Sequence, residues 1–131
     1  MVSYKTTEDI LSIVYGLLSG LTVPVYKGTK PSLAQPVEYV VVNSLPINAD
    51  RMQYCRVNVN YHAKDLDQGS AVGFVPNYSK IEAGSKLVLG ILEKVTGTNY
   101  MIDFEGQETM REDGFNEHLC NMKFSFKYIN T

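Results

Sequence analysis

The chain has 131 residues, of which 44% are hydrophobic and 20% are charged, and its formal net charge is −2 at pH 7. This length and composition predict one globular domain over residues 1–131, with a core large enough to fold without disulfides or metals. The charge balance gives no electrostatic argument for nucleic-acid binding, and no apolar run is long enough to cross a membrane.

The N-terminal residues lack the pattern of a secretory leader, because Glu8 and Asp9 lie where the apolar segment of a leader would be. Neither Cys55 nor Cys120 belongs to a C-x-x-C pair, so zinc and thioredoxin-type sites are not indicated. We expect a soluble intracellular protein in which both cysteines are reduced core residues. A disulfide between neighbouring strands remains the alternative, since strand order is not visible in the sequence.

The first predicted element is an amphipathic helix over residues 7–19. Thr6 is a suitable N-cap, and the acidic side chains in the first turn oppose the positive end of the helix dipole. An apolar stripe at helical spacing indicates the buried face, formed by Ile10, Val14, Leu17, Leu18 and Leu21. Gly20 suits the C-terminal end of this helix.

Three strands are predicted next, over residues 23–26, 37–43 and 55–62. The second is almost continuously apolar, which is typical of a strand covered on both faces, by this chain or by a partner. The third alternates, as expected of a half-buried antiparallel strand. Its apolar face has Cys55, Val57, Val59 and Tyr61, and its polar face has Arg56, Asn58, Asn60 and His62.

Residues 63–78 are predicted to form a long connecting loop, and such loops are uncommon in compact domains unless they have a function. Ser79 and Glu82 have the spacing of a capping box, which predicts a second helix from Ser79 to about Val95. Gly84 and Gly90 would let this helix lie close to a sheet.

The last two predicted strands cover residues 100–105 and 119–129, separated by an acidic loop over residues 105–117. Consecutive strands without crossover helices favour antiparallel pairing. We therefore predict an α+β fold with the order α-β-β-β-α-β-β. It is a mostly antiparallel sheet of about five strands with two helices packed on one face.

The sequence contains no pattern of a catalytic, metal or cofactor site. His62 and His118 are the only histidines and are interpreted as solvated polar residues. Asp65 and Asp67 resemble a carboxylate pair, but a solvated loop is the preferred interpretation. The segment YKGTK at residues 26–30 lacks the spacing of a phosphate loop, and no helix is predicted after it. We predict a protein that is not an enzyme and uses no cofactor.

The acidic segment between the last two strands allows two interpretations. A run of charges is usually a solvated surface. The alternative is an anionic rim or lumen that repels a polyanion, with Glu108, Glu112 and Asp113 as its candidate residues.

Residues 23–43 carry a resemblance to a known family. The residues that match the family pattern are Val25, Tyr26, Lys27 and Gly28, then Pro31 and Pro36, and then Tyr39 to Val42. Together with the preceding helix, this pattern resembles the tail-terminator and tail-completion proteins of long-tailed bacteriophages and their prophages. The order of elements extends the resemblance over most of the chain. Lys27 is a departure, because an acidic residue is common at that position of the pattern.

The resemblance implies a ring, commonly a hexamer, that ends the tail tube and forms the joint to the head. The implied partners are further copies of the chain, tail-tube proteins and connector proteins, with DNA passing through but not specifically bound. The implied location is the cytoplasm of the bacterial host during assembly and then the virion tail. Candidate subunit or tube contacts are Tyr26, Lys27, Lys30, Pro31, Tyr39, Phe74 and Tyr78. The alternatives are a head–tail connector or neck protein, and a small ligand-binding or hydrolase domain with its site in residues 63–78.

Overall fold

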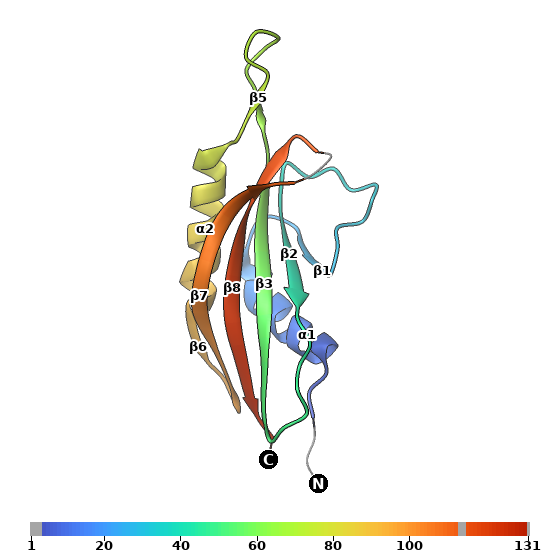
Figure 1. The fold of residues 1–131 in the computed structure, drawn as a ribbon, viewed down its shortest axis with the longest axis vertical. Helices are drawn as coiled ribbons and strands as arrows, with labels where there is room; N and C mark the ends of the chain where they lie inside the picture. The colour runs from blue at the N-terminus through green and yellow to red at the C-terminus, as the bar shows by residue number, and fades with distance from the viewer. Residues whose placement is uncertain (1–3, 113–114, 131) are drawn as a thin grey trace.

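The computed structural model describes residues 4–112 and 115–130. The fold is α+β: two helices cover a curled six-stranded sheet, and a two-stranded hairpin projects from one end of it (Figure 1). The helices are α1 (Thr7–Leu17) and α2 (Tyr78–Leu92), with a 3-10 turn at Leu18–Gly20. The strands are β1 (Val25–Lys27), β2 (Glu38–Ser44), β3 (Met52–Lys64), β4 (Leu66–Asp67), β5 (Phe74–Val75), β6 (Lys94–Thr96), β7 (Tyr100–Arg111) and β8 (Glu117–Ile129).

The six-stranded sheet has the order β1-β2-β3-β8-β7-β6 and is antiparallel except for the β1–β2 pair. The expected α+β fold and mostly antiparallel sheet are confirmed, but the expected number of about five strands is too low. The additional strands β4, β5 and β6 have two or three residues each. Strands this short contain too few residues for an alternating pattern to be recognised.

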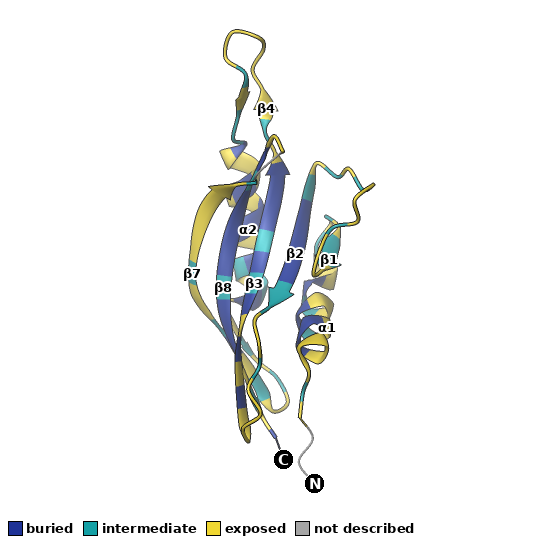
Figure 2. Cartoon of the chain, turned by 45° about the vertical axis from the view of Figure 1, so that its right-hand side comes forward, coloured by how far each residue is buried: buried dark blue, intermediate teal, exposed yellow. Residues whose placement is uncertain are grey.

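The core lies between the helices and one face of the sheet. In β3 and β8, Val59 is opposite Met122 and Val57 is opposite Phe124, and all four side chains are buried (Figure 2). The apolar faces of both helices belong to the same cluster. Cys55 and Cys120 are both buried in this cluster, which confirms that they are core residues, and their thiols are free.

Helix α1 begins as the sequence predicts. The Thr6 hydroxyl accepts a hydrogen bond from Asp9 N at 3.1 Å, and Asp9 Oδ2 accepts one from Thr6 N at 2.8 Å, which completes a capping box.

No helix within the described residues is long and apolar enough to span a membrane.

Helix α2 differs from its prediction at both ends. Its N-cap is Asn77, whose Oδ1 accepts from Lys80 N at 3.3 Å, so the expected cap at Ser79 is wrong. The helix ends at Leu92 because the chain enters β6 at Lys94. Gly84 lies against the ring of Tyr61 with no room for a Cβ, whereas the exposed Gly90 approaches no neighbour, so only the first glycine allows the expected close packing.

The predicted acidic loop is largely a strand. Strand β7 continues to Arg111 and pairs with β8 as far as His118, with a register irregularity between Phe104 and Gly106. Residues 105–111 are mostly exposed, so they lack the apolar alternation by which a strand is recognised in sequence.

Candidate functional site

The predicted connecting loop contains a hairpin, defined here as residues 65–77, which projects beyond the sheet along the long axis of the molecule (Figure 1). Leu66 pairs with Val75 and Asp67 pairs with Phe74. Gly69 and Gly73 have φ of 89° and 87°, a region that favours glycine, and these two residues close the turn at the tip.

The hairpin exposes apolar side chains that the described chain does not cover. The exposed fractions are 43% for Leu66, 65% for Val72 and 52% for Phe74, and Tyr78 at the start of α2 is 64% exposed. Scattered apolar residues on a surface are ordinary, but here three of them lie on one narrow projection. The hairpin is therefore suited to binding another protein surface.

The base of the hairpin is fixed by a partly buried hydrogen bond between Asp65 and His118. Asp65 Oδ1 lies 2.7 Å from His118 Nδ1, and the Asp65 side chain is only 4% exposed. The Asp65 backbone N–H also donates to Asn116 O at 2.9 Å. These contacts join the start of the hairpin to the start of β8, and they set the direction in which the hairpin leaves the sheet.

A second buried polar group lies beside this base and comprises Tyr39, His62 and Glu117, here called the base cluster. The Tyr39 hydroxyl donates to Glu117 Oε2 at 2.8 Å, and His62 Nδ1 lies 3.1 Å from the same oxygen. The rings of Tyr39 and His62 are stacked with centroids 4.3 Å apart. All three residues are buried, so each hydrogen bond satisfies a polar group that water does not reach.

The prediction that both histidines are solvated is wrong. His62 occupies the polar face of β3, as predicted, but the base cluster buries it, and His118 is held by Asp65. Burial lowers the pKa of His62, while Glu117 opposes this shift and Lys30 adds to it. Burial and the bond to Glu117 raise the pKa of Tyr39, which keeps its hydroxyl protonated and donating.

The lowered pKa of His62 predicts a specific pH dependence of stability. Below the ordinary histidine pKa of about 6.5 the unfolded chain binds the proton more readily than the folded chain, so the contribution of His62 to the free energy of unfolding declines. We expect the difference in unfolding free energy between the wild type and His62→Gln to shrink between pH 7.5 and pH 5. Denaturant unfolding of both proteins at several pH values measures this difference in free energy. A difference that does not change with pH would contradict the prediction. The charged groups that face the imidazole are the same in the wild type and in His62→Gln, namely Glu117, Glu112 and Lys30.

Two cavities of about 280 Å³ and 470 Å³ adjoin the base cluster, and both are lined in part by Tyr39 and Glu117. Within residues 4–112 and 115–130, no serine, threonine or cysteine is hydrogen-bonded to either histidine. No group of three or more histidine, cysteine, aspartate or glutamate side chains in these ranges is placed to hold a metal ion. The arrangement can orient side chains and position the hairpin, and its cavities have room for a small polar molecule.

Three of the candidate contact residues come together, because Lys30, Tyr39 and Phe74 all line the cavity of about 280 Å³. Phe74 and Tyr78 are exposed on and beside the hairpin, and Pro31 is exposed in the loop after β1. Tyr26 is half-buried in β1, and Lys27 lies 3.4 Å from Glu8 of α1. Lys30 donates to Ala34 O and stands over the ring of Tyr39. Tyr39 is 4% exposed, so its predicted role as a direct contact is corrected to a structural one inside the base cluster.

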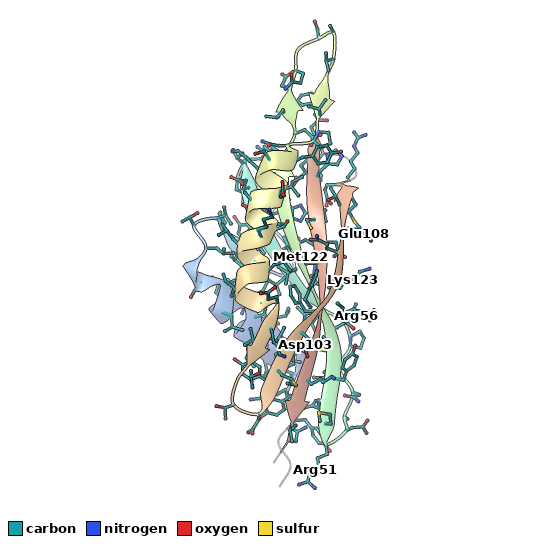
Figure 3. The ribbon with its side chains drawn as sticks, turned by 90° about the vertical axis from the view of Figure 1, so that its left-hand side faces the viewer. Arg51, Arg56, Asp103, Glu108, Met122 and Lys123 are labelled. Atoms are coloured by element: carbon teal, nitrogen blue, oxygen red, sulfur yellow. The ribbon has the colours of Figure 1, made fainter. Side chains whose placement is uncertain are left out.

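The candidate acidic residues are separated in the structure. Glu108 lies on β7, 3.9 Å from Lys123 of β8, and Figure 3 shows both on the sheet near Arg56. Glu112 lies after the strand, 3.9 Å from His62. Asp113 lies outside the described residues. A neighbouring lysine partly compensates the charge of Glu108, which weakens the repulsion expected of an anionic rim.

The chain matches no known protein-family model, and it matches no curated protein.

Proposed function

We propose that this chain is a structural, non-catalytic subunit that assembles into a ring, caps the tail tube of a long-tailed bacteriophage and forms the head–tail joint. The proposal of self-assembly rests on the hairpin, which projects away from the body of the subunit and has exposed apolar side chains. A contact with another protein would cover them. The phage assignment rests on the resemblance of residues 23–43 to tail-terminator and tail-completion proteins.

In this proposal the partners are further copies of the chain, the tail tube and the connector. Phe74 and Tyr78 supply apolar contact area, and Pro31 lies in a second exposed loop. Glu108 and Glu112 contribute negative charge near the DNA path, and the third acidic candidate, Asp113, lies outside the described residues. DNA passes without specific binding, because affinity for DNA depends on contacts between basic side chains and phosphate. The subunit acts in the bacterial cytoplasm during assembly and afterwards in the virion tail.

The native mass tests this proposal. Light scattering on a sizing column, over a range of protein concentrations, should give a closed ring of about six subunits that negative-stain images resolve. Phe74→Ser should weaken association at least tenfold, because buried aromatic side chains commonly dominate interface energies. Leu87→Ser is the matched control and should leave association unchanged, since Leu87 is an apolar residue on α2 with a similar exposed fraction, 60% against 52% for Phe74.

Two other results would redirect the proposal. Rings that bind connector-bearing capsids but not tail tubes would assign the chain to the neck instead. A monomer at every concentration would contradict self-assembly and favour a ligand-binding domain, for which the 470 Å³ cavity beside His62 and Glu117 is the specific candidate site. Soaking small polar molecules into crystals of such a monomer would then be the direct test of that cavity.

A further inference from the structure

A groove separates α2 from the outer half of β7. Its cavity has a volume of about 520 Å³. Ser85 and Leu89 line it from α2, and Gln107 and Thr109 line it from β7. Both β7 residues are exposed, so the helix does not cover this part of the sheet.

The strand that borders the groove has an open edge. β6 pairs with β7 only over Met101–Asp103, and Phe104 N donates to Glu93 O at 3.1 Å just beyond it. No described residue forms backbone hydrogen bonds with this side of residues 105–111, while β8 occupies the other side. Unpaired N–H and C=O groups along an edge strand can bind an extended segment of another chain.

A buried hydroxyl in the groove lacks a partner. Ser85 is 5% exposed, and its Oγ forms no hydrogen bond with any described residue. The adjacent Cys120 thiol donates to Gln107 Oε1 at 3.2 Å instead. Burial raises the pKa of the Cys120 thiol. A polar group of a bound segment could form the hydrogen bond that Ser85 lacks. This unpaired hydroxyl is a second reason, separate from the open edge of β7, to expect a bound segment in the groove.

The hairpin of a second copy has the properties that this groove requires. It is extended, and residues 68–76 at its tip carry no charge. The charged residues that line the groove are Glu82, Lys86 and Glu108. Glu82 lies 3.1 Å from Lys86, and Glu108 lies 3.9 Å from Lys123, so each glutamate has a lysine partner. Within one molecule the hairpin points away from the groove along the long axis, so it cannot occupy its own groove (Figure 1).

We propose that the hairpin of each subunit docks in the groove between α2 and β7 of a neighbouring copy. Backbone groups of the hairpin pair with the open edge of β7, and its apolar side chains fill the cavity. The contact is heterologous, because hairpin and groove are different surfaces, and repeating it around an axis closes a ring. This inference rests on the proposed self-assembly, and it adds the identity of the two surfaces that form the contact between subunits.

Disulfide trapping between two separately purified chains tests this contact, in a Cys120→Ala background that removes the native groove thiol. One chain carries Val72→Cys at the hairpin tip, and the other carries Thr109→Cys in the groove; both positions are exposed. After mixing and mild oxidation, the mixture should form at least five times more cross-linked dimer than either chain alone. The matched control replaces Thr109→Cys with Met101→Cys, an exposed position on β7 in a different cavity.

The outcomes separate the two proposals. Strong cross-linking to position 109 and weak cross-linking to position 101 supports the docking. Two results would overturn the docking and leave the ring proposal standing. In the first, rings form but cross-link equally or better to position 101. In the second, rings form but cross-link through two copies of Val72→Cys. A protein that stays monomeric and does not cross-link would overturn both.

Discussion

Glu117→Ala is expected to lower the free energy of unfolding by about 2–4 kcal/mol, because it leaves two buried polar groups without their acceptor. Glu117 Oε2 is bound by the Tyr39 hydroxyl at 2.8 Å and lies 3.1 Å from His62 Nδ1. The side chain is 7% exposed, so water does not readily replace it. Denaturant unfolding monitored by circular dichroism gives the free energy directly.

Two variants sharpen the test of Glu117. Glu117→Gln keeps an oxygen acceptor and should cost clearly less than the alanine variant. Glu108→Ala removes an exposed glutamate from the neighbouring strand β7 and should change stability by no more than about 0.5 kcal/mol. If Glu117→Ala were as mild as Glu108→Ala, the base cluster would not stabilise the fold.

Phe126→Ala is expected to be more damaging still, with a loss of about 3–5 kcal/mol. Phe126 is fully buried, lies opposite Cys55 of β3 and Ile102 of β7, and stacks on Tyr100 with ring centroids 5.4 Å apart. Alanine would leave a cavity at the junction of three strands. The midpoint of denaturant unfolding measures the loss, and the slope of the transition checks that unfolding stays two-state.

Phe115→Ala is the matched control for Phe126→Ala, because Phe115 is 58% exposed in the turn before β8. It should change the free energy of unfolding by no more than about 0.5 kcal/mol. Equal losses for the two phenylalanines would show that Phe126 does not pack as described.

The strongly patterned elements could be predicted from the sequence, because apolar residues recur at a regular spacing on the face that packs in the core. Thr6 and Asp9 define the start of α1, and alternating apolar residues define β3 and β8. The β7 segment over residues 105–111 and the hairpin were missed because both are exposed, and exposure removes the hydrophobic signal. Gly69 and Gly73 were the sequence signal that could have indicated the turn of the hairpin.

The base cluster could not be predicted, since it joins residues far apart in the sequence. His62 lies on the polar face of β3, which predicts contact with water when the strand is considered alone. Its burial depends on Tyr39 from β2 and Glu117 from β8, and hence on the strand order. Asn77 and not Ser79 caps α2. Both residue types are suitable caps and lie two positions apart, and the path of the hairpin decides between them.

The position of β8 has a consequence for synthesis on the ribosome. β8 is translated after the other described strands, yet it lies between β3 and β7 in the middle of the sheet (Figure 1). Until residues 117–129 emerge, β3 and β7 each lack a partner along one side, and the core lacks Phe124 and Phe126. Folding of the sheet is therefore delayed until residues 117–129 have emerged, and the nascent chain exposes apolar strands to chaperones throughout that interval.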